Sequence, residues 1–134
     1  FFLILLICVS TDLGGYIFGK IFKGPKLIKI SPNKTYAGMI GAFVLSIIST
    51  SIYLNYYEFF IIKKAEILSF YDFIFVILIS SVSQLGDIII SYFKRKSKIK
   101  NTGKIIPGHG GILDRIDGMI FAFPSSYLIL KAIY

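Results

Sequence analysis

Four long hydrophobic segments alternate with shorter polar segments along the 134-residue chain. The hydrophobic segments run from Phe1 to about Phe22, from about Tyr36 to Tyr57, from about Phe73 to Phe93 and from about Ile112 to Tyr134. A helix that crosses a bilayer needs about 20 mostly apolar residues, and each segment has that length. The pattern predicts an all-α, polytopic transmembrane protein with about four membrane helices. Residues 1–134 are expected to form one membrane-embedded domain, and further helices are expected to precede Phe1 because the chain begins inside a hydrophobic run.

The polar segments differ in charge, which predicts their side of the membrane. Residues 20–34 contain five lysines and residues 94–111 contain six basic side chains, whereas residues 58–72 are roughly neutral. Basic loops stay in the cytoplasm, so we expect the two basic segments there and the mixed segment outside. Hydrophobic residues make up 55% of the chain, above the share of about 45–50% typical of soluble domains. The net charge of +8 is therefore explained by topology, and a nucleic-acid partner is not expected.

Acidic residues inside the hydrophobic segments are the first candidates for chemistry. Asp87 and Gln84 are embedded in the third hydrophobic segment, and Asp87 lies about two helical turns before the basic Lys94. Asp114 and Asp117 share one helix face by their spacing. Three carboxylates then meet at one membrane level, which is unfavourable unless a cation joins them. Oxygen ligands suit a hard cation such as Mg²⁺. Alternatively, Asp117 merely caps a helix and pairs with a neighbouring charge.

A second polar cluster, Ser31–Thr35, precedes the second hydrophobic segment. Its hydroxyls, the Lys34 ammonium and the free N–H groups at a helix N-terminus form a plausible phosphate cradle. Ser31 or Thr35 could equally be a plain helix cap. The small residues that follow favour close packing of this helix against another: Ala37, Gly38, Gly41 and Ala42.

A glycine-rich loop around His109 adjoins the acidic cluster. Glycines on both sides of this His permit a ligand to approach the backbone closely, although a lone loop His is more often only solvated. Asp12, near Gly14 and Gly15, could face the same cavity or pair with a lysine of another helix. A basic loop, a Ser/Lys/Thr turn and a carboxylate–metal centre together predict a polyphosphate site. Lipid-embedded walls suggest a lipid co-substrate, and hence metal-assisted phosphoryl or nucleotidyl transfer.

These motifs closely resemble the signature of the phosphatidate cytidylyltransferase (CDP-diacylglycerol synthase) family. The matching residues are Ser91-Tyr92-Phe93-Lys94-Arg95, Lys100, Gly103, Pro107-Gly108-His109-Gly110-Gly111, Asp114-Arg115 and Asp117, with Asp12, Gly15-Tyr16, Gly19-Lys20, Ser31–Thr35 and Leu85-Gly86-Asp87 upstream. The resemblance implies the C-terminal catalytic part of an integral membrane enzyme of phospholipid biosynthesis, in the inner membrane if bacterial. Such an enzyme joins CTP and phosphatidate into CDP-diacylglycerol, releases pyrophosphate, requires Mg²⁺ with a monovalent cation such as K⁺, and faces the cytoplasm. A homodimer is left open.

Roles follow from the resemblance, position by position. The implied catalytic residues are Asp87, Asp114, Lys94 and His109; the implied metal-site carboxylates are Asp87 and Asp114 with Asp117 beside them; the implied substrate-binding residues are Ser31, Lys34, Thr35, Lys94, Arg95, Lys100, His109, Gly110, Gly111 and Arg115. Two positions depart from the family pattern, since Ala37 stands for a Glu and Asn101 for an Asp. The alternatives are an inactive truncated remnant of such an enzyme, or a transporter or channel fragment with an acidic ion site.

Overall fold

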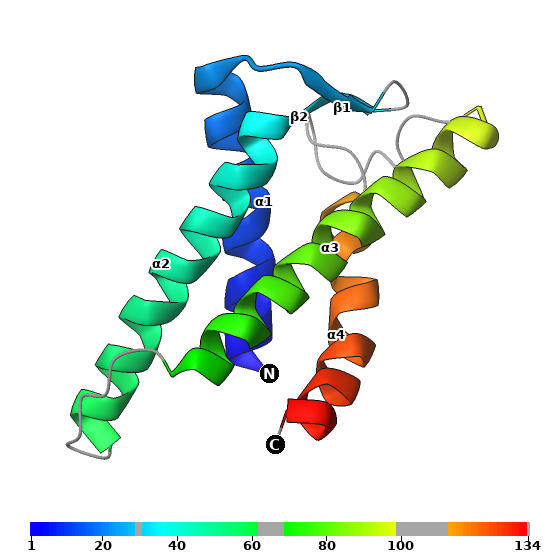
Figure 1. Cartoon of the computed structure of the whole chain (residues 1–134). Helices are drawn as coiled ribbons and strands as arrows, with labels where there is room; N and C mark the ends of the chain where they lie inside the picture. Colours follow the sequence, from blue (N-terminus) through cyan, green and yellow to red (C-terminus); the bar gives the residue numbers. More distant parts are fainter. Residues whose placement is uncertain (29–30, 62–68, 99–112, 134) are drawn as a thin grey trace.

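The structure, a computed structural model of the chain, describes residues 1–28, 31–61, 69–98 and 113–133. The elements in chain order are α1 (Phe2–Phe22), β1 (Lys26–Ile28), β2 (Ser31–Thr35), α2 (Tyr36–Ile61), α3 (Phe70–Lys96) and α4 (Leu113–Ile133). Helices α1 and α2 lie side by side, and α3 crosses them at a slant with α4 packed against it (Figure 1). The β1–β2 hairpin, the last turns of α1 and the last turns of α3 share one end of the bundle, called here the hairpin end, and α4 begins below that end (Figure 1).

Three of the helices are long and apolar enough to cross a membrane. They are Phe2–Phe22, Tyr36–Tyr56 and Phe70–Lys96 within the described ranges. Helix α4 has 21 residues, which is also sufficient, but charged residues occupy its first turns. The predicted all-α membrane fold is confirmed, with three to four spans. The helices also alternate in direction as predicted, because each helix runs opposite to the one before it (Figure 1).

The helix bounds differ from the prediction at two helices: α2 ends four residues later than expected, and α3 begins three residues earlier and ends three residues later. The first turn of α3 is held by a capping box, in which the Ser69 N–H donates to Asp72 Oδ2 over 3.1 Å. The main element that the sequence did not predict is the antiparallel pair of β1 and β2, within a segment interpreted as a basic loop. Its lysines and prolines give no alternating hydrophobic pattern, so periodicity alone does not indicate strands.

Glycines on both helices bring α1 and α2 into close contact. A Cβ atom on Gly14 would lie 2.6 Å from the Gly41 carbonyl oxygen and 2.8 Å from Ala42 Cα, and one on Gly38 would lie 2.6 Å from the Gly15 carbonyl oxygen. Small residues allow such backbone approach, which is a common way for membrane helices to associate. The predicted packing role of the small residues in α2 is confirmed, and the glycines of α1 form the other half of the contact.

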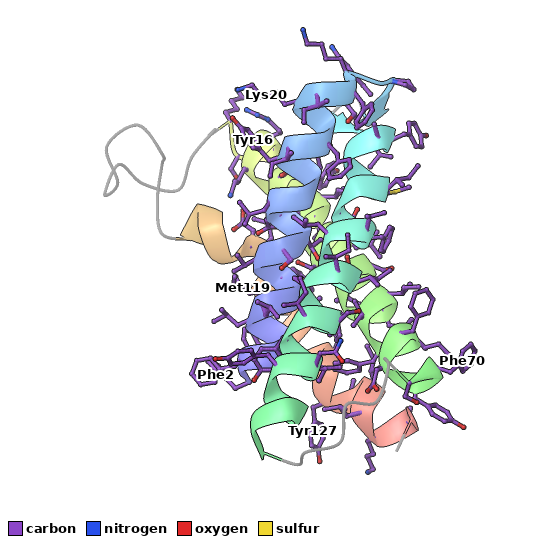
Figure 2. The ribbon with its side chains drawn as sticks, turned by 90° about the vertical axis from the view of Figure 1, so that its left-hand side faces the viewer. Phe2, Tyr16, Lys20, Phe70, Met119 and Tyr127 are labelled. Atoms are coloured by element: carbon purple, nitrogen blue, oxygen red, sulfur yellow. The ribbon has the colours of Figure 1, made fainter. Side chains whose placement is uncertain are left out.

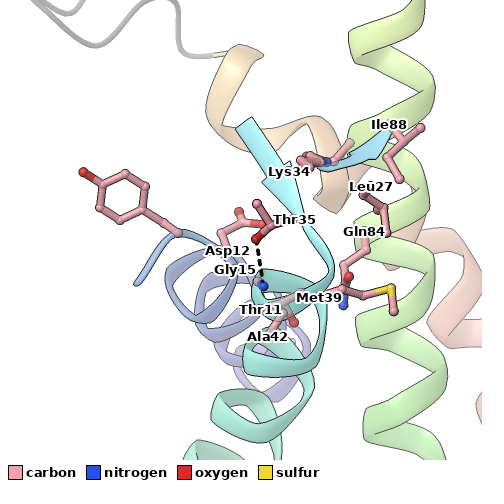
Figure 3. A pocket seen from close by; sticks show the side chains of 13 residues that line it. Thr11, Asp12, Gly15, Leu27, Lys34, Thr35, Met39, Ala42, Gln84 and Ile88 are labelled. Carbon is pink, nitrogen blue, oxygen red and sulfur yellow. Dashed lines mark hydrogen bonds and ion pairs between the residues drawn. The ribbon is translucent and has the colours of Figure 1, made fainter. Parts of the chain in front are cut away.

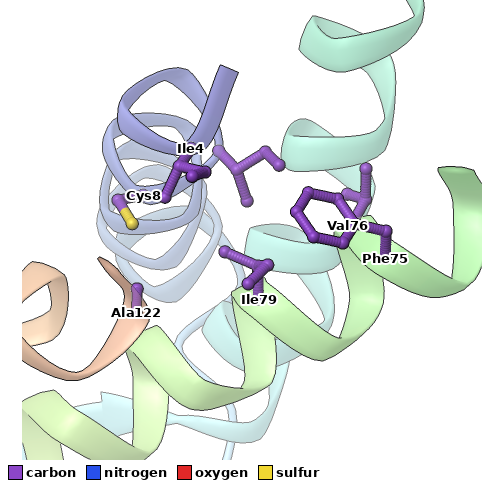
Figure 4. Close-up of a cluster of buried hydrophobic side chains, with 7 residues drawn as sticks. Ile4, Cys8, Phe75, Val76, Ile79 and Ala122 are labelled. Carbon is purple, nitrogen blue, oxygen red and sulfur yellow. The ribbon is translucent and has the colours of Figure 1, made fainter. Parts of the chain in front are cut away.

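The hydrophobic core lies in the half of the bundle away from the hairpin. It joins α1, α3 and α4 through Ile4, Ile7, Cys8, Phe75, Val76, Ile79 and Ala122 (Figure 4). Apart from Ala122 of α4, these residues come from the first halves of α1 and α3, so the apolar packing stabilises the end where those helices begin. The half toward the hairpin is left for polar side chains.

Exposed aromatic residues mark the end opposite the hairpin. Phe2, Phe70 and Tyr127 are each about 70% exposed and lie at one level, whereas Tyr16 and Lys20 lie at the hairpin end (Figure 2). The Lys20 ammonium is 5.7 Å from the centre of the Tyr16 ring, within range of a cation–π contact. Aromatic side chains at both ends of a bundle are typical of membrane–water interfaces.

Candidate functional site

A pocket of about 260 Å³ lies at the hairpin end, between α1, α2, α3 and the hairpin (Figure 3). Its lining residues are Thr11, Asp12, Gly15, Tyr16, Leu27, Lys34, Thr35, Gly38, Met39, Ala42, Gln84, Asp87 and Ile88. The pocket thus combines basic, acidic, hydroxyl and amide groups between helices that are otherwise apolar. Polar groups are costly in such surroundings, so their convergence indicates a functional site.

The charged centre of the pocket is an ion pair between the hairpin and α3. Lys34 Nζ lies 3.1 Å from Asp87 Oδ2, and the two side chains are 28% and 29% exposed. The sequence shows no basic residue within a helical turn of Asp87, because its partner comes from 53 positions earlier in the chain. The ion pair offsets the cost of holding either charge at the edge of a low-dielectric region.

Thr35 caps α2 and also lines the pocket. Its Oγ1 accepts a hydrogen bond of 3.1 Å from the Gly38 N–H, drawn as the dashed line in Figure 3. Thr35 is therefore a cap of α2, and its hydroxyl proton is still able to donate to a ligand. Its role in substrate binding stays a prediction. The N-terminus of α2 faces the same space, and its dipole favours anions there. Ser31 begins β2, and its side chain lies outside the described part of the structure.

Two pocket residues from α1 continue the polar wall. Asp12 faces the cavity, as one of the two interpretations of the sequence proposed. Thr11 Oγ1 donates to the Ile7 carbonyl over 2.7 Å and lies 3.0 Å from Ser80 Oγ of α3. The hydroxyl pair joins α1 to α3 directly below the pocket, and neither member was singled out from the sequence.

Gln84 is a further pocket residue to which sequence reasoning assigned no role. It lies on α3 one turn before Asp87, and within the described chain its Nε2 atom is buried without a hydrogen-bond partner. The sequence does offer a signal for Gln84, since residues three apart lie on one helix face and Gln84 precedes Asp87 by three.

A second ion pair connects α3 to α4 outside the pocket. Lys94 Nζ donates to Asp117 Oδ2, and the side chains are only 11% and 8% exposed. The helices are very close here, since a Cβ on Gly118 would lie 2.5 Å from Ser83 Oγ. Neither charged residue lines the pocket. The contact agrees with the alternative interpretation that Asp117 pairs with a neighbouring charge.

The buried Lys94–Asp117 pair gives a stability prediction. Asp117→Asn removes the carboxylate charge that pairs with the buried Lys94 ammonium and is expected to lower the free energy of unfolding by about 3 kcal/mol. The double variant Lys94→Met/Asp117→Leu removes both charges and should recover most of that loss. Unfolding in detergent micelles measures both effects. Equal stability of Asp117→Asn and the parent would contradict a structural role for the pair.

Several predicted site residues fall outside the described residues. They are Lys100, His109, Gly110 and Gly111, together with the side chains of Asp114 and Arg115, whose backbone forms the first turn of α4. Arg95 is exposed near the end of α3. Within the described ranges, no three acidic, His or Cys side chains are grouped closely enough to hold a metal ion. The metal site of Asp87, Asp114 and Asp117 stays a prediction.

Long apolar helices around a polar, charged pocket define an integral membrane protein with a binding site near one membrane face. The sequence profile of the Cytidylyltransferase family matches residues 1–133. The chain belongs to this family.

Relatives named phosphatidate cytidylyltransferase are similar to the chain over most of its length. The protein from Staphylococcus saprophyticus is 39% identical over 126 residues, which cover 93% of this chain and 46% of the relative. The protein from Rickettsia conorii is 40% identical over 136 residues, covering 98% and 58%, and that from Bacillus subtilis is 38% identical over 122 residues, covering 90% and 43%. The chain therefore spans about half the length of the curated relatives it matches.

Proposed function

We propose that the protein transfers a cytidylyl group from CTP to phosphatidate, giving CDP-diacylglycerol and pyrophosphate. The observation that carries the proposal is the pocket itself, where an ammonium group and a helix N-terminus meet two carboxylates between membrane helices. Phosphates are bound by such cationic groups, and the apolar helices around them admit a lipid. The names of the similar proteins support the same substrates.

The proposed reaction requires no nucleophile from the protein. A phosphate oxygen of phosphatidate attacks the α-phosphorus of CTP and forms a new P–O bond. The bond from the α-phosphorus to the bridging oxygen breaks, and pyrophosphate leaves with the electron pair. The protein must therefore position two anionic substrates and neutralise their charge. Lys34 and the N-terminus of α2 are placed to do so from one wall of the pocket.

The pocket suits the magnesium ion that we propose as cofactor. Asp12 and Asp87 supply carboxylate oxygens to the same space, and magnesium in nucleotide enzymes is bound through one or two carboxylates plus substrate phosphates. We propose that Asp87 holds the ion together with Asp114. When bound, Mg²⁺ neutralises phosphate charge during transfer. Lys34 neutralises Asp87 in the structure and can contact a phosphate at the same place.

We further propose that the pocket faces the cytoplasm. The hairpin end carries the lysines between α1 and α2 and the cluster Lys94, Arg95 and Lys96 at the end of α3. Basic segments beside membrane helices remain on the cytoplasmic side. CTP would then reach the pocket from water, and phosphatidate from the adjoining leaflet.

The proposal predicts incorporation of radiolabel from CTP into lipid by membranes containing the protein, with phosphatidate added. Lys34→Met should lower this incorporation by about 10²-fold, because a donor to phosphate charge is lost at the pocket. The matched control is Lys131→Met, an exposed lysine in the last turn of α4, which should retain full activity. Membranes with no CTP-dependent labelling, or equal labelling by both variants, would contradict the proposal.

A further inference from the structure

The Gln84 side chain occupies an unusual place in the pocket. It lies on the same face of α3 as Asp87 and about 4.5 Å further from the hairpin end along the helix axis. Its Nε2 atom is buried and has no hydrogen-bond acceptor among the described residues. An unsatisfied buried amide costs about 1–3 kcal/mol, so a position of this kind favours a ligand that supplies an acceptor.

The surroundings of Gln84 differ from those of the charged pair. Lys34, Asp87 and Asp12 provide the charges of the pocket, whereas Met39 and Ala42 of α2 give it an apolar part further from the hairpin. Figure 3 shows the Gln84 and Met39 side chains next to each other, with Lys34 on strand β2 above them. The pocket therefore passes from a charged region through a single amide to apolar side chains.

We infer that Gln84 binds the lipid substrate by donating a hydrogen bond from Nε2 to an ester carbonyl oxygen of phosphatidate. This inference rests on the proposed function. Phosphatidate has the same order of groups as the pocket, with a phosphate, then ester carbonyls joined to it through glycerol, then hydrocarbon chains. With its phosphate beside Lys34, its ester groups lie one helical turn deeper, at the level of Gln84. The first methylene groups then contact Met39 and Ala42.

The pyrimidine ring of CTP also offers a carbonyl acceptor. Two features favour the lipid as the source. Gln84 lies deeper in the membrane-spanning part of α3 than the charged pair, and the residues around it are apolar and close to hydrocarbon. Burial of a nucleotide base in this region is unfavourable, because its polar edges would lose more hydrogen bonds to water than one amide replaces.

The test compares ester-linked phosphatidate with its dialkyl ether analogue, which lacks the carbonyl oxygens, in mixed micelles with CTP. The wild-type protein is expected to use the ester about tenfold better in kcat/KM, a factor that corresponds to about 1.4 kcal/mol. Gln84→Met, of similar length but without a donor, should lose about tenfold on the ester and nothing on the ether. The KM for CTP should not change.

Other results would overturn the inference. Equal losses on both lipids would indicate a structural role for Gln84, and unchanged activity on both would exclude a contact with substrate. A raised KM for CTP with an unaltered ester-to-ether ratio would assign the amide to the base. A wild-type protein inactive with either lipid would instead contradict the proposed function and the inference with it.

Discussion

Asp87→Asn is expected to lower CTP-dependent lipid synthesis by about 10²–10³-fold while leaving the protein folded. The substitution removes the negative charge that pairs with Lys34 and that we propose as a magnesium ligand. The effect on stability should be about 1 kcal/mol or less, because the pair is more than a quarter exposed and such pairs contribute little to folding. Radiolabel transfer and thermal unfolding of the same purified sample measure the two effects.

The matched control for this variant lies on the same helix. Asp72→Asn makes the same chemical change at the other end of α3, where Asp72 accepts a hydrogen bond from the Ser69 N–H in the capping box. It should cost about 1 kcal/mol of stability and leave activity unchanged. If Asp87→Asn retained full activity, or if both variants lost activity equally, Asp87 would have no special role in the reaction.

The second large effect is expected at the crossing of α1 and α2. Gly14→Ala places a methyl group 2.6 Å from the Gly41 carbonyl oxygen and 2.8 Å from Ala42 Cα, and backbone atoms cannot rotate away. The helices must separate, so the free energy of unfolding should fall by about 2–3 kcal/mol. Activity should fall too, because residues of both helices line the pocket. Unfolding in detergent micelles and radiolabel transfer check the two parts.

The neighbouring glycine supplies a control for the unfolding measurement. A methyl group on Gly15 would meet its nearest atoms at 3.8 and 4.0 Å, which is ordinary van der Waals contact. Gly15→Ala should therefore be neutral, or slightly stabilising through higher helix propensity. Equal destabilisation by the two substitutions would mean that chain flexibility, and not contact between the helices, accounts for the effect.

The membrane helices could be predicted because lipid imposes one dominant requirement on the sequence. Segments of about 20 apolar residues are needed whatever the helices pack against, so α1 and α4 begin and end within a residue of the expected limits. The hairpin has no comparable requirement on its length or hydrophobicity. Its strands pair through backbone groups over a few residues at the membrane surface, and their side chains carry no periodic signal.

The candidate site could be predicted only in part, because charge partners are a property of the three-dimensional arrangement. The sequence singled out Lys34, Asp87, Lys94 and Asp117, yet it did not indicate which lysine pairs with which aspartate. The two pairs connect different helices, and only the first lies in the pocket. The sequence shows Gln84 as a polar residue in an apolar segment. Only the structure shows that its Nε2 atom is buried and has no hydrogen-bond acceptor within the described chain.

The pairing of Lys34 with Asp87 also bears on how the protein enters the membrane during synthesis. An aspartate within a spanning helix costs about 2.5–3.5 kcal/mol at insertion near the helix centre, and somewhat less toward its end. Because Lys34 precedes Asp87 by 53 residues, α1, the hairpin and α2 leave the ribosome before α3 is complete. The earlier helices can hold the ammonium group at the surface as α3 arrives. The ammonium group of Lys34 then lowers the cost of inserting α3, because it pairs with the carboxylate of Asp87.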